Sequence, residues 1–307
     1  MRMVAHADEF LGRVFVKEVG GKLRRIEVRE VSDPNDLRKL VDVQVSAWGM
    51  GVDRTEAVPS HVLKAASENS GVVVAAFDID TGEALAFAWG FLAIDNDGLY
   101  HYSHQSAVIE EAKGSGLGFI VKQAQREAVV MRGLRRMRWT FDPLQALNTR
   151  FNLGKLGVVS WEYAINYYGY MEDSLNRGLR TDRLKVWWFL DSERVRRKAK
   201  GEFESPSYGR ALDAGAEEVI EFDDKGPSGF RKVDSDLVLI EVPRSLDEAR
   251  VRGTVSLWRE SVAEAMLYYM SRGYIDFEAV CDKGSGRVFH LLWRNSLEEI
   301  LRGSTID

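Results

Sequence analysis

The sequence predicts an α/β (α+β) protein with a mixed, mostly antiparallel central sheet flanked by helices, and an additional C-terminal strand-helix-strand-strand region. Three observations carry this expectation. Glycine turns such as Gly20-Gly21 join neighbouring strand patterns, which is typical of antiparallel hairpins. Apolar residues recur at helical spacing between these hairpins. A further strand pattern, Leu99–Val108, runs into a glycine-rich loop and then into a helical pattern, Phe119–Met131.

The first part of the chain reads as hairpins and helices in alternation. Strands over Arg13–Val19 and Leu23–Val31 flank the Gly20-Gly21 turn. The residues Ser32 to Asp36 then open a helix, because they offer a capping residue, a proline in the first turn and acidic residues near the N-terminus. The elements expected between this helix and the glycine loop are a helix over 60–67 and strands over 72–77 and 84–93.

The loop Lys113–Gly118 (KGSGLG) predicts a site for a phosphorylated ligand. A loop between strand and helix directs free backbone N–H groups and the positive helix end at an anion. Alternating glycines let the backbone approach without a Cβ in the way. The spacing fits neither a Walker loop, which ends in Gly-Lys-Ser/Thr, nor the dinucleotide fingerprint G-x-G-x-x-G. An ordinary flexible turn remains an alternative.

The wider pattern resembles the acyl-CoA-binding motif of the GNAT superfamily of N-acetyltransferases, (Q/R)-x-x-G-x-(G/A). Lys113 stands where Gln or Arg is usual, and Gly116 and Gly118 match. The resemblance covers roughly residues 25 to 191. Its downstream parts are a strand at Met137–Phe141, a helix at Asn148–Gly157 ending in K-L-G, and strands at Val158–Tyr168 and Asp182–Leu190. The segments TFDPL, FNLGKLG, NYYG and LNRGL are also similar to an uncharacterised branch with an extra C-terminal region.

This resemblance implies an acyl-CoA-binding domain over residues 1–195, with acetyl-CoA or another acyl-CoA as co-substrate. The CoA pyrophosphate would bind the backbone of the loop, and the pantetheine arm would run beside the end of the preceding strand. Helix residues after the next strand would add further contacts. The cofactor-binding residues expected on this basis are Ser106, Ala107, Val108, Lys113, Gly114, Ser115, Gly116, Leu117, Gly118, Asn148, Asn152 and Lys155.

Transfer to an amine requires proton transfer, and the expected catalytic residues are His104, Asp142 and Tyr168. A hydrogen-bonded strand histidine and a turn or cap aspartate are equally good interpretations of the first two. Many family members use a tyrosine on the helix before the K-L-G turn to protonate the thiolate, but Leu153 occupies that place here. Tyr167 and Tyr168 are the substitutes, although core packing is the simpler role for at least one of them.

Composition bounds the partners and the compartment. The 307 residues carry a formal charge of −5, which gives no reason to expect nucleic-acid binding. No apolar run approaches the roughly 20 residues that span a bilayer. The single Cys281 cannot form an internal disulfide, so we expect a reduced, cytoplasmic protein. His101 and His104 point to opposite faces of a strand, and no metal is expected. The expected partner is a small-molecule or peptide amine, and a homodimer stays open.

After Leu190 the chain changes character. Residues 191–201 are charged, and residues 205–229 mix Pro, Gly, Ser and Asp with little periodicity, which is typical of a linker or surface loop. A strand over 236–242, a long helix over 245–271 and a hairpin of 274–280 with 287–293 follow. The helix has an apolar stripe at helical spacing, formed by Val255, Trp258, Val262, Ala265, Met266 and Tyr269. We therefore expect residues 196–307 to form a β-α-β-β region that packs or shapes the acceptor site, separately or as one body with the first domain.

Two alternatives to an N-acetyltransferase remain. The first is a CoA-binding module that has lost catalysis and acts as a sensor or assembly part, which the absent helix tyrosine favours. The second is a structural protein with a fortuitous glycine turn, which predicts no CoA binding.

Overall fold

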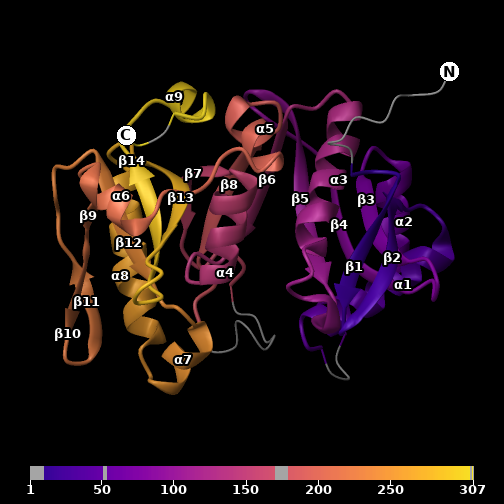
Figure 1. The fold of residues 1–307 in the computed structure, drawn as a ribbon, viewed down its shortest axis with the longest axis horizontal. Coiled ribbons are helices and arrows are strands. Elements are labelled where there is room, and N and C mark those ends of the chain that lie inside the picture. Colours follow the sequence, from indigo (N-terminus) through magenta and orange to yellow (C-terminus); the bar gives the residue numbers. More distant parts are fainter. Residues whose placement is uncertain (1–9, 51–53, 170–178, 305, 307) are drawn as a thin grey trace. The chain divides into compact units, whose positions relative to one another are not determined.

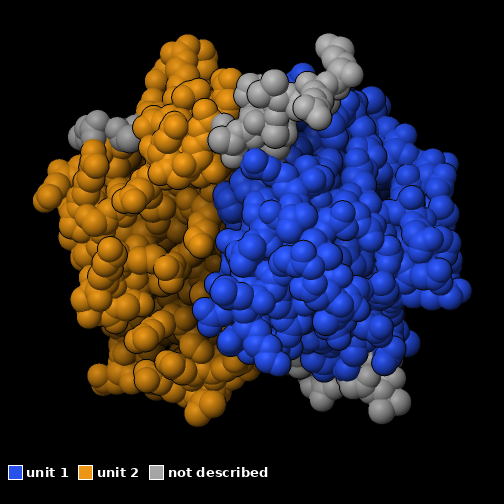
Figure 2. All heavy atoms as spheres, turned by 45° about the vertical axis from the view of Figure 1, so that its right-hand side comes forward, with its two compact units in different colours: residues 1–138, 173–175 blue, residues 139–172, 176–307 orange. Residues whose placement is uncertain are grey.

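The structure is a computed structural model that describes residues 10–50, 54–169, 179–304 and 306. The chain divides into two compact units, residues 1–138 with 173–175 (the N-terminal unit) and residues 139–172 with 176–307 (the C-terminal unit; Figure 2). This division falls inside a strand at Arg138, and the predicted domain boundary near residue 195 stays a prediction. Most of the LNRGL segment lies outside the described residues.

The N-terminal unit contains a sheet in the order β1-β2-β3-β4-β5-β6, whose last strand continues beyond the unit boundary (Figure 1). Neighbouring strands are antiparallel except β5 and β6, which are parallel, so the predicted mixed, mostly antiparallel sheet is confirmed. The strands are β1 Arg13–Val19, β2 Lys22–Glu30, β3 Val72–Asp78, β4 Ala84–Asp95, β5 Gly98–Val108 and β6 Arg136–Phe141.

Helices complete this unit, and their starts follow the expected capping chemistry. In α1 (Pro34–Ala47) the Asp33 side chain accepts hydrogen bonds from the backbone N–H groups of Asn35 and Asp36. The helix α2 (Ser60–Glu68) follows, and both bury apolar residues against β3 and β4. A short 3₁₀ turn, η1 (Glu110–Ala112), precedes the glycine loop, and α3 (Leu117–Met131) begins two residues before the predicted start.

The C-terminal unit has strands in the order β8-β7-β13-β14-β12-β9, antiparallel except for β12 and β9. A separate two-stranded hairpin joins β10 to β11. The strands are β7 Val159–Ala164, β8 Arg183–Phe189, β9 Glu217–Glu218, β10 Ile220–Asp223, β11 Gly226–Phe230, β12 Leu237–Val242, β13 Ile275–Cys281 and β14 Val288–Trp293. The predicted C-terminal strand-helix-strand-strand order is confirmed.

Three expectations for this unit need correction. Residues 191–229 are not a loop, because they contain two helices and three strands. The helix predicted over 245–271 is two helices, which are separated near Gly253, where φ is 70°. The segment after β6 is a short α-helix followed by a π-helical stretch, η2. The helical segments are α4 Ala146–Thr149, η2 Arg150–Leu156, α5 Glu193–Ala199, α6 Tyr208–Asp213, α7 Leu246–Val251, α8 Val255–Met270 and α9 Leu297–Leu301.

A core of α8 and the C-terminal strands holds this unit together. Its apolar stripe, predicted from spacing, is buried from Val255 to Tyr269 against β12 and β14. None of the helices in the described ranges is long and apolar enough to cross a membrane.

Candidate functional site

The glycine loop joins the end of β5 to the start of α3, as the sequence predicted. Gly114 and Gly116 have φ angles of 82° and 87°, in the left-handed region that favours glycine. Gly116 caps α3, and Gly118 lies close to the strand, because a Cβ there would lie 3.4 Å from Val108 Cγ2. The two left-handed residues turn the chain sharply, so that the loop backbone faces outward at the helix N-terminus.

Several backbone N–H groups of this loop are available to a ligand. Within the described part of the chain, the N–H groups of Gly114, Gly116 and Gly118 have no hydrogen-bond acceptor. The Ser115 hydroxyl forms hydrogen bonds within the loop, because its Oγ donates to the carbonyl of Ala112 and accepts from Leu117 N–H. Three free donors at the N-terminus of a 15-residue helix form a favourable environment for an anion.

Two lysines lie near the loop. Lys113 forms an ion pair with Glu110, which restrains its side chain. Lys17, on β1, was missed by the sequence analysis, yet its Nζ would lie 3.9 Å from a Cβ on Gly116. No local pattern connects residues 17 and 116, because their proximity follows from the pairing of the sheet.

The strand that leads into the loop has a free edge and a bulge. Pairing of β5 with β6 is confined to His101 with Met137 and Tyr102 with Arg138, although β5 continues to Val108. On its other edge β5 pairs with β4, and the register shifts so that His104 is the extra residue between Ser103 and Gln105. Ser106, Ala107 and Val108 therefore keep one edge without a strand partner among the described residues.

His104 lies on the face of β5 opposite to His101, as predicted. Its ring is exposed on one side and packs edge-to-face on Trp89 at 5.0 Å between ring centroids. Burial of part of the ring lowers the pKa of His104 below its usual 6.5, so the imidazole is neutral near pH 7. A neutral imidazole can accept a proton, and the catalytic role of His104 stays a prediction.

A buried polar cluster lies on the other face of β5, against α3. Lys122 Nζ donates to Ser103 Oγ at 2.8 Å and to Gln125 Oε1 at 2.9 Å. Burial lowers the pKa of the Lys122 ammonium to about 7. Burial, together with the positive charges of Lys122 and Arg132, lowers the pKa of the adjacent His101 to about 3. This unit therefore contains a lysine that titrates near neutrality without access to solvent.

A Lys122→Met variant should change how stability depends on pH. Lys122 is charged in the unfolded chain up to about pH 10.4 but only up to about pH 7 in the fold. The unfolded chain therefore binds more protons between these values, and stability rises with pH. Guanidinium titrations at pH 6, 8 and 10 give the unfolding free energy of each protein. The value for the wild type minus the value for Lys122→Met should increase with pH. A difference that is constant across this range would show that Lys122 keeps an ordinary pKa.

In the C-terminal unit, Asp142 is held at the end of β6 by an arginine from α8. Its two carboxylate oxygens accept hydrogen bonds from Arg259 at 2.6 and 2.8 Å, and the pair is almost completely buried. One oxygen also accepts from Leu144 N–H at 2.9 Å, which is the turn role that the sequence allowed. Both oxygens of Asp142 thus have structural partners. The proposed proton-transfer role of Asp142 stays a prediction.

The other predicted residues of this unit fall into exposed and buried groups. Tyr167 and Tyr168 are 42% and 45% exposed, so the expectation that one of them packs in the core is wrong. The Tyr168 hydroxyl lies 3.1 Å from Thr140 Oγ1. Asn148 and Lys155 are exposed, whereas the buried Asn152 accepts a hydrogen bond from Trp139 Nε1. Leu153, at the usual tyrosine position, is fully buried.

An Asp276–His290–Thr149 arrangement in the same unit has the spacing of a hydrolytic triad. His290 Nδ1 lies 2.7 Å from Asp276 Oδ2, and Nε2 lies 3.0 Å from Thr149 Oγ1. However, Nε2 also lies 3.0 Å from the carbonyl oxygen of Pro143, which can only accept. Thr149 Oγ1 also lies within hydrogen-bond distance of the carbonyl oxygens of Pro143 and Gln145, at 3.4 and 3.3 Å, so it has acceptors other than His290. All three side chains are buried, and we assign the arrangement a structural role.

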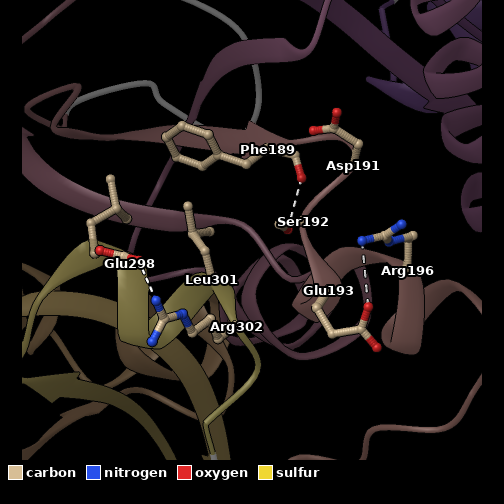
Figure 3. Close-up of a pocket in the computed structure, with 9 residues that line it drawn as sticks. Phe189, Asp191, Ser192, Glu193, Arg196, Glu298, Leu301 and Arg302 are labelled. Atoms are coloured by element: carbon tan, nitrogen blue, oxygen red, sulfur yellow. Dashed lines mark hydrogen bonds and ion pairs between the residues drawn. The ribbon is translucent and has the colours of Figure 1, made fainter.

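A shallow hollow of about 660 Å³ lies between α5 and α9 of this unit (Figure 3). Ion pairs between Glu193 and Arg196 and between Glu298 and Arg302 border it. None of the predicted site residues lines it. In the described ranges no group of three His, Cys, Asp or Glu side chains is arranged to hold a metal ion.

No family model and no curated protein sequence matches the chain. Solved structures do match about half of it. The ribosomal-protein-S18-alanine N-acetyltransferase of Escherichia coli is 14% identical over 53% of this chain and 92% of its own, with a TM-score of 0.41. An acetyltransferase of the GNAT family from Streptococcus pneumoniae is 15% identical over 53% of this chain and 98% of its own, with a TM-score of 0.43.

A third solved structure is also similar to about half of the chain. Naa20 of Chaetomium thermophilum, solved with a bisubstrate analogue, is 16% identical over 57% of this chain and 90% of its own, with a TM-score of 0.43. The resemblance to these structures concerns the fold alone.

Proposed function

We propose that the chain is an acyl-CoA-dependent N-acyltransferase that transfers acetyl from acetyl-CoA to an amine by direct attack in a ternary complex. The observation that carries this proposal is the free edge of β5 leading into three unpaired N–H groups at the start of α3. A long ligand with an amide-containing arm and a pyrophosphate matches both features, because a strand edge pairs with amides and the loop binds phosphate.

In this proposal, the pyrophosphate accepts hydrogen bonds from the backbone of the loop, and Lys17 contributes positive charge beside Gly116. The pantetheine arm lies along Ser106, Ala107 and Val108 as an added strand. The thioester then lies near His104. This residue is the bulge that interrupts the regular backbone pairing of β5 with β4.

The reaction needs three events. The neutral amine attacks the thioester carbonyl carbon and forms a C–N bond, the C–S bond breaks, and the departing thiolate takes up a proton while the amine loses one. His104, uncharged near pH 7, is the proposed acceptor of the amine proton. Tyr168 is the proposed donor to the thiolate. Asp142, bound to Arg259, is kept as a proposed contributor to proton transfer.

A specific observation favours the second candidate, a CoA-binding module without catalysis. Leu153 is buried where the usual tyrosine would lie, and Asp142 is engaged in a buried ion pair. This candidate predicts CoA binding without turnover of any amine, whereas the transferase predicts both.

Calorimetric titration of the full chain with acetyl-CoA and with free CoA tests the shared premise. Saturable binding of either ligand supports both candidates, and release of free thiol in an amine screen then separates them. Absence of binding to folded protein would overturn both.

A further inference from the structure

Four aromatic rings gather on one face of the β4–β5 hairpin, around the bulge. Trp89 and Phe91 come from β4, and Tyr102 and His104 come from β5. The ring centroids of Phe91 lie 5.4 Å from Tyr102 and 6.1 Å from His104, and Trp89 lies 6.0 Å from Phe91. We call these four residues the aromatic platform. Neighbouring rings at these distances form a continuous apolar surface rather than isolated contacts.

The platform is open to solvent where it meets the bulge. Trp89 forms its floor and is 4% exposed, whereas Phe91 is 40% exposed and His104 is also exposed. This face belongs to the side of the sheet that α1 and α2 cover, because Trp89 packs in their core cluster. The platform therefore presents Phe91 and His104 to solvent beside the buried ring of Trp89.

The chemistry of the platform favours one class of ligand. Ring faces carry negative potential and attract ammonium groups, while their area binds apolar groups. Trp89 Nε1 already donates a hydrogen bond to Gln105 Oε1 at 2.9 Å. A ligand would therefore contact the face of the indole ring and not its N–H group. His104 is neutral near pH 7 and does not repel a cation. The four side chains of the platform are themselves aromatic and carry no carboxylate, which a polyamine site would require.

We propose that the aromatic platform is the acceptor site, and that its ligand is a small primary amine with an aromatic or apolar group, held by ring contacts instead of carboxylates. This inference rests on the proposed function, since the platform is centred on the bulge beside the free strand edge assigned to the thioester. The ammonium form lies against the rings. It loses one proton to solvent to give the neutral amine, and His104 accepts the second proton as this amine attacks the thioester.

Titration of the full chain with 2-phenylethylamine, with and without saturating CoA, tests this assignment. A cation–π contact of 1–2 kcal/mol corresponds to about a fivefold to thirtyfold change in affinity. We expect Phe91→Ala to weaken phenylethylamine binding by this factor. Phe91→Leu should weaken it also, because leucine keeps an apolar side chain but has no ring face to attract the ammonium. The matched control is Leu92→Ala, because Leu92 is also 40% exposed but lies on the opposite face of β4.

The outcomes separate the two proposals. Equal affinity in wild type and Phe91→Ala, or no binding of phenylethylamine to CoA-loaded protein, overturns the platform while leaving CoA binding intact. Tighter binding of spermidine than of phenylethylamine would also overturn it, because that preference needs carboxylates. Absence of CoA binding overturns the proposed function, whatever the amine does.

Discussion

A Gly116→Val variant should bind CoA at least about a hundredfold more weakly than the wild type, because it loses hydrogen bonds to a charged group that are worth roughly 1.5–3 kcal/mol each. Gly116 has a φ of 87° and caps α3. A β-branched residue is strained there and would turn the adjacent N–H groups away from the anion. Calorimetric titration with CoA measures the effect directly.

The matched control for this variant is Gly133→Val at the other end of α3. Gly133 has a similar φ of 82°, and a Cβ at this position would have no atom within 4 Å, so it shares the backbone strain but not the loop. We expect Gly133→Val to lose stability without losing CoA affinity. If Gly116→Val is folded and keeps wild-type affinity, the loop does not bind the pyrophosphate.

A Glu278→Gln variant should lower the free energy of unfolding by about 3–5 kcal/mol, the usual effect of breaking a buried ion pair. Glu278 is fully buried and accepts hydrogen bonds from Arg194 at 3.0 Å and from Lys198 at 2.8 Å. Ser205 Oγ donates to its other oxygen at 2.7 Å. Replacing this carboxylate with an amide leaves two buried cations without a counter-charge.

The effect of this substitution should depend on pH. Burial already lowers the pKa of Lys198 to about 8, although the charge of Glu278 opposes the shift. Without that charge the pKa of Lys198 falls further. The variant should therefore regain stability as the pH rises toward 10, where the folded lysine is neutral and the unfolded chain still binds the proton.

Denaturant titrations at pH 7 and pH 10, followed by tryptophan fluorescence, measure this loss and its recovery. Glu298→Gln is the control, because Glu298 pairs with Arg302 on the surface at 73% side-chain exposure. We expect that variant to change stability by no more than about 1 kcal/mol. A similarly small change in Glu278→Gln would show that the buried cluster is not charged.

The buried charges also explain why one segment was misread from sequence. Residues 191–201 look like a solvated linker, because charged side chains are usually exposed. In the structure they include α5, whose Arg194 and Lys198 turn inward to Glu278, about 80 positions away along the chain. The same holds for Arg259, which lies within the apolar stripe of α8 and reaches Asp142. A charge inside an apolar stripe was the available signal, but its partner could not be identified.

The sequence by itself determined the features that depend on neighbouring residues. These are the glycine hairpins, the capped start of α1, the strand-loop-helix unit at Lys113–Gly118 and the apolar stripe of α8. Backbone preferences and side-chain periodicity act over a few residues, so they are legible in the order of the chain. The tertiary structure alone decided which distant side chains meet: Lys17 beside Gly116, Lys122 against Ser103 and the rings of the aromatic platform. Those contacts follow from strand register and helix packing, because a single register shift, such as the bulge at His104, changes which side chains share a face.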